Sequence, residues 1–263
     1  MNILSEIVKN KKNELIPQEI NHTIKELEES EYFKIDCKSL KSSILSSKSG
    51  IICEFKRRSP SNENINYKSS ISKVVSGYQK AGAAGLSILT NKGYFDGDIE
   101  DIVNIRGISN IPILRKEFII SEYQIIEAKS IGSDAILLIA SILSNQEILT
   151  FSSLAKSLGL EVLLEIHSAD ELNKISSNNI DVIGVNNRNL DTLEIDLNNS
   201  IELYDKLPNE FVKISESGIS KVESILKLKE IGFDGFLIGE KFMKTTNPME
   251  SAYNFIKKVE DEI

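Results

Sequence analysis

Residues 131–139 read IGSDAILLI, and this stretch sets the pattern on which the fold depends. It combines a helix end, a glycine suited to the left-handed cap position, and then a buried apolar strand. The same form recurs as AGAAGLSIL at residues 81–89 and as IGFDGFLIG at residues 231–239. The recurrence predicts a helix–strand unit that the chain uses several times.

Short apolar runs, separated by amphipathic stretches, fill the chain after about residue 50. Their starts lie roughly 20 to 35 residues apart, which suits a strand, a helix and two loops. Several are apolar almost without interruption, as expected of parallel strands buried on both faces. The runs are Ile51–Phe55, Leu86–Leu89, Pro112–Leu114, Ala135–Ile139, Val162–Glu165, Val182–Val185, Phe211–Ile214 and Gly235–Ile238. These eight runs in a chain of 263 residues favour a closed (β/α)₈ TIM barrel over an open sheet.

Residues 1–49 precede the apolar runs and carry helical patterns of their own. The apolar residues of NILSEIV share one helical face, and IKELEES continues in helical register. We therefore predict two helices packed on a barrel of residues 50–263. Because no Pro/Gly-rich linker divides the chain, we expect one domain over residues 1–263. A plug at the bottom of the barrel and a lid over the site are both open as roles for the N-terminal helices.

The composition argues against several classes of protein. A net charge of −8 and a pI near 5.1 disfavour nucleic acid or an anionic membrane as the main partner. The N-terminus lacks the apolar core of a signal peptide, and no apolar run approaches the roughly 20 residues that span a bilayer. Cys37 and Cys53 suggest no disulfide framework, and with His22 and His167 they show no metal-ligand spacing. We therefore expect a cytoplasmic protein without a metal, whose cationic groups serve a small anion.

Charged residues recur at the ends of the apolar runs. A barrel of parallel strands gathers the carboxyl ends of its strands on one rim, where enzymes of this fold place their sites. Burying such charges costs several kcal/mol per ion unless they are well paired, which favours a functional role over a plain structural ion pair. The residues expected on this rim are Glu54, Lys56, Lys116, Glu165, Arg188 and Glu216.

Strand alternation predicts which side chains point into the barrel. If Cys53 and Phe55 face the helices, Glu54 and Lys56 face the interior. Asn186 and Arg188 should likewise project together after DVIGV. The forked guanidinium suits a carboxylate or phosphate of a ligand. A salt bridge from Arg188 to Glu216 is the structural alternative, and both could hold.

Phosphate-binding signals come from the last two strands. SESG at residues 215–218 and LIGEKF at residues 237–242 each place a glycine where a strand gives way to a loop or helix. Backbone N–H groups there can hold a phosphate, often after strands seven and eight of a barrel. Ser59 could add a hydroxyl from the first loop. Phe95 and its neighbour Tyr94 could stack on an aromatic substrate or merely pack a loop, and His167 is expected to form a plain hydrogen bond.

Taken together, these segments resemble the indole-3-glycerol-phosphate synthase family of tryptophan biosynthesis. The similar segments begin with IICEFKRRSPS at residues 51–61 and end with GFLIGEKFM at residues 235–243. Between them lie LSILTNKGYFDG, PILRKEFIISEYQIIEAKSIGSDAILLI, LGLEVLLEIHSADEL, IGVNNRNLDTLEIDL and ISESGI. They agree in order and spacing over nearly all of the chain after residue 50. Two departures stand out, because Asn62 and Glu63 replace a usual Lys-Gly pair and Glu117 replaces a common Asp.

The resemblance implies a carboxy-lyase that closes the indole ring of 1-(2-carboxyphenylamino)-1-deoxyribulose 5-phosphate, releasing CO₂ and water. It implies no cofactor or metal. Lys116 matches the family's general acid, Glu165 its general base, and Lys56 a lysine that contacts the substrate carboxylate, with the division of acid work between the lysines open. Other positions match polar catalytic residues (Glu54, Asn186, Glu216), substrate contacts (Arg188, Phe95, Phe118, Leu190) and phosphate or sugar contacts (Ser59, Ser217, Gly218, Gly239).

The implied reaction needs a proton donor at the ketone oxygen, and two other functions are alternatives to it. A lysine whose pKa is lowered by neighbouring cations or burial could give a proton to the ketone oxygen. Two other functions are considered, a phosphoribosyl isomerase such as phosphoribosylanthranilate isomerase and a non-catalytic barrel that binds a phosphorylated ligand. The expected partner is a small phosphorylated substrate for a monomeric enzyme, and association with other tryptophan-pathway enzymes stays open.

Overall fold

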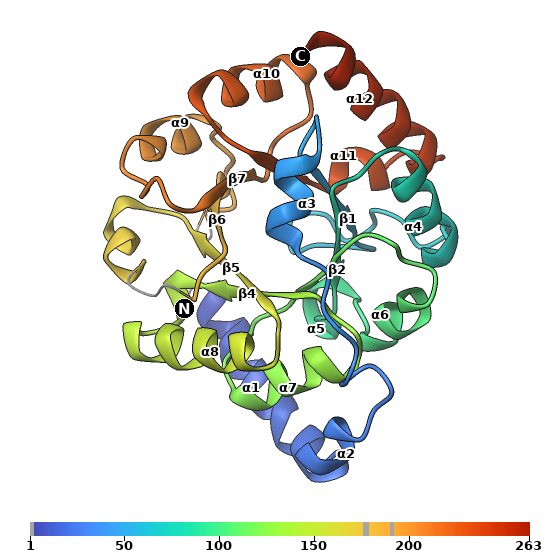
Figure 1. Cartoon of the computed structure of the whole chain (residues 1–263), viewed down its shortest axis with the longest axis vertical. Helices are drawn as coiled ribbons and strands as arrows, with labels where there is room; N and C mark the ends of the chain where they lie inside the picture. The colour runs from blue at the N-terminus through green and yellow to red at the C-terminus, as the bar shows by residue number, and fades with distance from the viewer. Residues whose placement is uncertain (1–2, 176–178, 190–191) are drawn as a thin grey trace.

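The computed structural model describes residues 3–175, 179–189 and 192–263. In this part of the chain, eight parallel strands pair in sequence order and β8 returns to β1, so the sheet is a closed barrel (Figure 1). The strands are β1 (Ile51–Phe55), β2 (Gly85–Leu89), β3 (Ile113–Lys116), β4 (Ala135–Ile139), β5 (Glu161–Ile166), β6 (Val182–Asn186), β7 (Val212–Glu216) and β8 (Gly235–Ile238). The predicted (β/α)₈ TIM barrel is confirmed.

Several strands extend further toward their carboxyl ends than their apolar runs. Lys116 pairs with Leu89 of β2, and Glu216 pairs with Asn186 of β6. These polar residues therefore belong to the strands, because backbone pairing continues beyond the last apolar residue of each run. Pro112 falls outside β3, since proline has no N–H to give to a ladder. Lys116 and Glu216 are thus held by sheet backbone and not by loops.

Helices surround the barrel and cover the outer face of the sheet (Figure 1). They are α4 (Ile71–Lys80), α5 (Lys92–Phe95), α6 (Ile99–Arg106), α7 (Glu122–Ser130), η1 (Ala140–Ile142), α8 (Asn145–Ser157), η2 (Ala169–Lys174), α9 (Asn198–Tyr204), α10 (Val222–Ile231), α11 (Glu240–Met243) and α12 (Pro248–Glu262). Gly82, Gly132 and Gly232 have φ of 88°, 89° and 119°. The left-handed glycines predicted at the recurring helix–strand junctions are therefore confirmed.

The prediction of two N-terminal helices is wrong. Within the described residues this segment contains three helices, α1 (Ile3–Asn21), α2 (Ile24–Glu28) and α3 (Leu40–Ser46). Thr23 starts α2 with a capping box to Glu26, and Ser39 caps α3 through its hydroxyl. Each cap accepts from a backbone N–H of a new first turn, which favours separate short helices over a continuous one.

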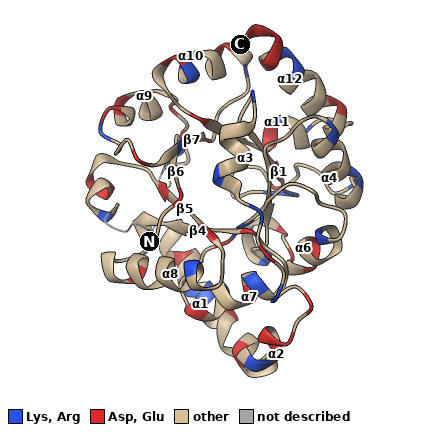
Figure 2. Cartoon of the chain, viewed as in Figure 1, with Lys and Arg blue, Asp and Glu red and all other residues tan. Residues whose placement is uncertain are grey.

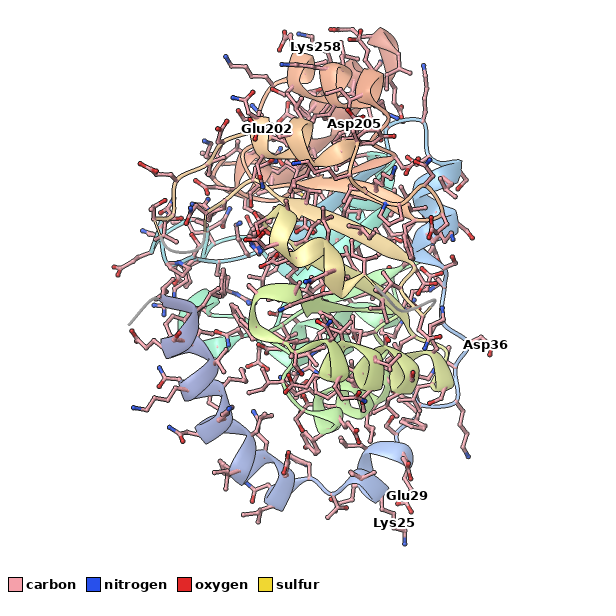
Figure 3. The ribbon with its side chains drawn as sticks, turned by 90° about the vertical axis from the view of Figure 1, so that its left-hand side faces the viewer. Lys25, Glu29, Asp36, Glu202, Asp205 and Lys258 are labelled. Atoms are coloured by element: carbon pink, nitrogen blue, oxygen red, sulfur yellow. The ribbon has the colours of Figure 1, made fainter. Side chains whose placement is uncertain are left out.

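The N-terminal helices lie at opposite ends of the barrel. Leu40 and Ile44 of α3 pack with Ile52 in the barrel interior, and the Ser43 hydroxyl donates to the Ala84 carbonyl before β2. Helix α3 therefore plugs the amino ends of the strands, where Figure 1 shows it over the centre of the ring. In the side view of Figure 3, α1 lies along the opposite side of the barrel from α3.

Two apolar layers hold the barrel. The larger lies between sheet and helices and includes Cys53 and Phe55, as strand alternation predicted. The smaller fills the barrel interior with side chains such as Leu114 and Leu163. Acidic and basic residues are interspersed on the outer helices (Figure 2). None of the helices in the described ranges combines the length and apolar character that a membrane crossing needs.

Candidate active site

A cavity of about 380 Å³ lies at the carboxyl ends of the strands. All the described residues that the sequence proposed for the site line it, and Leu190 lies outside the described residues. The proposed residues in the wall are Glu54, Lys56, Ser59, Phe95, Lys116, Phe118, Glu165, Asn186, Arg188, Glu216, Ser217, Gly218 and Gly239. The ends of β1, β3, β5, β6 and β7, with residues just after them, supply many of its charged and amide groups. Residues that are far apart in the chain are therefore brought to one rim.

Two lysine ammonium groups are paired with carboxylates inside the cavity. Lys116 Nζ lies 2.5 Å from Glu216 Oε2 and 3.1 Å from Glu165 Oε2. Lys56 Nζ lies 2.8 Å from Glu54 Oε1. Glu54 and Glu165 are buried, and Ser87 on β2 donates its hydroxyl to Glu54. The cavity thus contains ammonium groups that can donate protons and carboxylates that can accept them.

The lowered pKa that the sequence suggested for a lysine acid is not found at Lys116. Burial lowers the pKa of this ammonium, but the carboxylates of Glu216, Glu165 and Glu54 outweigh burial and hold the pKa above its usual range. The expectation assumed cationic neighbours, whereas the closest charged groups in the structure are anionic. Lys116 is therefore a stable cation in the unliganded cavity, and a substrate that draws it away from these carboxylates would make it a stronger acid.

The two carboxylates beside Lys116 differ in their affinity for protons. Burial raises the pKa of Glu165, but Lys116, His167 and a side-chain hydrogen bond from Asn186 together hold it below the usual value. At Glu216, burial and the negative charge of nearby Glu165 outweigh the lowering effect of Lys116 and raise the pKa of Glu216 to about 7. Pairs of groups whose pKa values are pushed apart are a common basis for acid–base work. Glu165 is thus the ionised member and Glu216 the one able to exchange a proton near neutrality.

Gly184 on β6 makes room for the Glu216 carboxylate. A Cβ atom at this position would lie 2.2 Å from Glu216 Oε1. No side chain could occupy that space without moving the carboxylate, because atoms this close overlap. Gly184 was not among the predicted site residues, although a glycine inside a strand is a signal of close approach.

Asn186 and Arg188 project from the end of β6 and the loop after it. Asn186 Oδ1 accepts from the Arg188 backbone N–H at 2.9 Å, and Arg188 Nη1 donates to the Leu193 carbonyl at 2.9 Å. Among the described residues, Arg188 forms no ion pair with Glu216, so the salt-bridge alternative is not found. The guanidinium instead lines the cavity where an anionic ligand can meet it.

Asn187, which the sequence analysis passed over, fixes two neighbouring loops. Its side-chain Nδ2 donates to Ser215 Oγ and to the carbonyls of Glu216 and Ser217, and its Oδ1 accepts from Ser200. Because strand alternation turns it away from Asn186, it packs outside the cavity. The two consecutive asparagines in GVNNRN were the sequence feature that could have drawn attention to Asn187. Asn187 therefore joins the segment after β6 to the segment after β7.

Aromatic and apolar side chains form the remaining wall. The Phe95 and Phe118 rings are 6.2 Å apart and line the cavity, together with Leu4 of α1. Tyr94 turns instead toward α1, where its hydroxyl contacts Asn10 and Glu6. Of the two options left open for the aromatic pair, Phe95 thus faces the ligand space and Tyr94 packs a loop.

Glu117, in the RKEF segment, is a buried connection between the barrel rim and α1. Its carboxylate accepts from Thr90 Oγ1 at 3.0 Å, from Asn91 Nδ2 at 3.3 Å and from the Phe118 N–H at 2.8 Å. It also pairs with the buried ammonium of Lys11 on α1 at 3.3 Å. The first helix therefore sits over the cavity as the lid alternative supposed, while α3 takes the plug position.

The predicted phosphate end of the cavity contains backbone turns and basic side chains. Ser217 and Gly218 have φ of 68° and 77°, so the chain turns sharply after β7. The Ser59 backbone exchanges hydrogen bonds with Asn62, which orders the first loop. Lys241 and Lys244, which the sequence analysis did not select, also line the cavity. Their position after the glycine of LIGEKFMK was the available signal. In the described ranges, no group of three or more His, Cys, Asp or Glu could hold a metal ion.

The fold and the site together define a (β/α)₈-barrel enzyme whose cavity pairs lysines with carboxylates at the carboxyl ends of its strands. A family model described as indole-3-glycerol phosphate synthase matches residues 4–255. The chain belongs to the indole-3-glycerol phosphate synthase family.

Relatives support this assignment over the full length of the chain. Indole-3-glycerol phosphate synthase of Bacteroides thetaiotaomicron is 48% identical over 258 residues, which cover 98% of this chain and 99% of that protein. The protein of the same name from Prochlorococcus marinus strain MIT 9515 is 42% identical over 225 residues, covering 82% of this chain and 76% of that protein.

Among solved structures, the tryptophan synthase alpha subunit from Legionella pneumophila strain Paris matches with a TM-score of 0.61 and 14% identity. The match covers 86% of this chain and 100% of that one. A likeness at such low identity shows the barrel fold alone.

Proposed function

We propose that the chain closes the indole ring of 1-(2-carboxyphenylamino)-1-deoxyribulose 5-phosphate to give indole-3-glycerol phosphate, CO₂ and water. The family and its relatives support this carboxy-lyase activity. The observation that carries the residue roles is the contact of Lys116 with both Glu165 and Glu216 in a cavity that also holds Phe95 and Phe118. Proton-transfer groups and an aromatic wall thus face the same ligand.

The first step joins the ring carbon that bears the carboxylate to the ketone carbon. Lys116 gives a proton to the ketone oxygen as the carbon–carbon bond forms, so the oxygen becomes a hydroxyl. Lys56, beside Glu54 at the rim, contacts the substrate carboxylate before it leaves as CO₂. The bonding electrons of that carboxylate return to the ring, and aromaticity is restored. Fixed cations near the developing oxyanion and the carboxylate lower the barrier by electrostatic stabilisation.

The last step removes the new hydroxyl as water. A lysine ammonium supplies the proton that leaves with the hydroxyl, and Glu165 accepts a proton from the carbon next to nitrogen. Glu165 suits this work because it is ionised, as its lowered pKa requires. Glu216, with a pKa of about 7, can return a proton to Lys116. Asn186 supports the loop that carries Arg188.

The phosphate and the aromatic ring occupy opposite parts of this cavity in our proposal. Ser59, Ser217, Gly218 and Gly239 contact the phosphate and sugar, while Phe95 and Phe118 hold the ring. A phosphoribosyl isomerase would need an acid–base pair without that aromatic wall, and a non-catalytic barrel would need no paired lysine and carboxylate groups. Adding the carboxyphenylamino substrate and following indole fluorescence tests the proposal, and no signal from folded protein would reject it.

We further propose that the enzyme acts as a monomer in the cytoplasm on a freely diffusing small substrate. The described charged and aromatic walls enclose a cavity of about 380 Å³, which supports action on a small substrate. Association with other enzymes of tryptophan biosynthesis is not needed to complete that wall.

Arg188→Ala is expected to raise KM about 10- to 100-fold with a smaller change in kcat. The charged guanidinium lines the cavity, and hydrogen bonds to charged groups are typically worth about 1.5–3 kcal/mol. Initial rates over a range of substrate concentrations measure both constants. Lys25→Ala, which removes an exposed cation of α2 (Figure 3), is the control and should change neither. Unaltered KM and kcat in Arg188→Ala would remove this residue from the site.

Gly184→Ala is expected to lower kcat about 10²-fold, because displacing a catalytic group by about 1 Å can have an effect of that size. The new Cβ would overlap Glu216 Oε1 and push this carboxylate away from Lys116. Gly107→Ala is the matched control, since a Cβ there would meet no atom within 4 Å. Turnover is measured by indole fluorescence. A Gly184→Ala protein as active as Gly107→Ala would show that the carboxylate position is not critical.

A further inference from the structure

A second, wider cavity of about 890 Å³ lies beside the first. Its wall includes residues of α1, η1 and η2 and shares Leu4, Asn186 and Arg188 with the catalytic cavity. His167, directly after β5, lines the second cavity, whereas Glu165 at the end of the same strand lines the first. The end of β5 therefore presents one residue to each of the two cavities.

The two carboxylate oxygens of Glu165 face nitrogen atoms of different side chains. Oε2 lies 3.1 Å from Lys116 Nζ, and Oε1 lies 3.3 Å from His167 Nε2. The other ring nitrogen, Nδ1, lies 3.8 Å from Glu171 Oε2. Neither ring nitrogen has a well-aligned hydrogen bond in the described part of the chain, so attraction between the ring and these acids depends on a protonated imidazole. The imidazole is thus placed between the catalytic carboxylate and a second acid.

The backbone of His167 is held firmly although its ring is not. Its N–H donates to Glu171 Oε2 at 2.7 Å, and its carbonyl accepts from Asn199 Nδ2 at 3.1 Å. The Asn199 amide also donates to the Asn186 carbonyl at 3.0 Å. The side chain is only 12% exposed. These contacts keep the ring beside Glu165 without using either of its nitrogens.

We propose that His167 is a positioning residue whose imidazolium holds Glu165 Oε1 from the side of the second cavity, so that the carboxylate stays ionised and presents Oε2 to the catalytic cavity. The inference rests on the proposed function, because it assigns a partner to the general base of that reaction. The expected plain hydrogen bond of His167 is replaced by an ion contact. Lys116 can then turn toward the substrate while Glu165 keeps a cationic neighbour.

The charged groups around His167 favour its cationic form. Burial lowers the pKa of the imidazole, but Glu171, Glu165 and Glu216 outweigh burial and raise it above the usual value. The groups that face it from neighbouring elements or line the same cavity are Glu165, Glu171, Glu216, Glu194, Asp196, Glu202, Lys9, Lys12 and Arg188. A group with a raised pKa gives its full effect below the ordinary value and loses it as pH rises through the raised value. Its support of Glu165 should therefore fade on the alkaline side.

His167→Gln is expected to lower kcat about tenfold near pH 6 with KM unchanged, which is less than the 10²–10⁴-fold of a general base itself. The amide fills much of the same space but carries no charge. The ratio of wild-type to variant kcat should fall toward one as pH rises through the raised pKa of His167, because the wild-type imidazole is then neutral too. A ratio that is the same at every pH would indicate a structural role and overturn the proposal. His22→Gln, at the exposed histidine after α1, is the matched control.

His167→Ala supplies a second test, because the vacated space adjoins an open cavity. Free imidazole should enter from that side and raise kcat of the variant several-fold at low pH, in a saturable manner, without affecting wild type. No effect of imidazole would count against the proposal. If wild type itself forms no indole product, the proposed function fails. If wild type turns over and His167→Gln matches it at all pH values, only the role of His167 fails.

Discussion

Lys116→Met is expected to lower kcat by about 10²–10⁴-fold, the range that a positioned proton donor contributes. Methionine has a similar length and suits the mostly buried position, but it cannot give a proton to the ketone oxygen. Its removal also leaves Glu165 and Glu216 without their shared cation. Both effects act on the first chemical step, so CO₂ release and indole fluorescence should fall together. A single-turnover experiment that follows both signals measures this.

Lys213→Met is the matched control for the loss of a buried lysine. Lys213 is also buried on a strand, but its ammonium contacts the Tyr204 ring and Asn209 outside the catalytic cavity. This variant should keep wild-type turnover even if its melting temperature falls. Far-UV circular dichroism of both variants shows whether each has folded. Wild-type turnover in folded Lys116→Met would show that another group donates the first proton.

The barrel could be predicted because its signals are local. Each unit can be recognised within about ten residues by a left-handed glycine followed by a buried strand, as in IGSDAILLI. Closure follows from many such units in a chain of suitable length. The predicted strand ends were less accurate, because the apolar runs stop before the backbone pairing that includes Lys116 and Glu216. The number of N-terminal helices was missed because short helices depend on individual caps such as Thr23.

The membership of the site was predictable, but its electrostatics was not. Charges at the ends of parallel strands must share a rim, so Lys116 could be placed near Glu165 and Glu216 without coordinates. The pKa direction of Lys116 depends on which group is closest, and its partners lie 49 and 100 residues away in sequence. Only the closed sheet sets those distances. The same holds for the group that Gly184 accommodates, because only the structure places the Glu216 carboxylate beside it.

Glu165→Gln is the second substitution with a large expected effect, a fall in kcat of about 10²–10⁴-fold with little change in KM. Glutamine keeps the size of the side chain and an oxygen that can accept from Lys116, but it is a poor acceptor of a proton from carbon. Glu161→Gln is the matched control on the same strand. Glu161 contacts Ser39 and the Lys41 N–H of the α3 region, at the end of β5 away from the cavity. That variant should retain turnover.

The timing of CO₂ release in Glu165→Gln separates the roles of the two catalytic residues. If Glu165 accepts its proton only as water leaves, one equivalent of CO₂ should still form in the first turnover, because ring closure and decarboxylation come earlier. Indole fluorescence should lag behind it, and an unsaturated product should appear only slowly. Lys116→Met should instead suppress both signals from the start. Equal suppression of both in Glu165→Gln would place its proton transfer before decarboxylation and require the two residues to act in the same step.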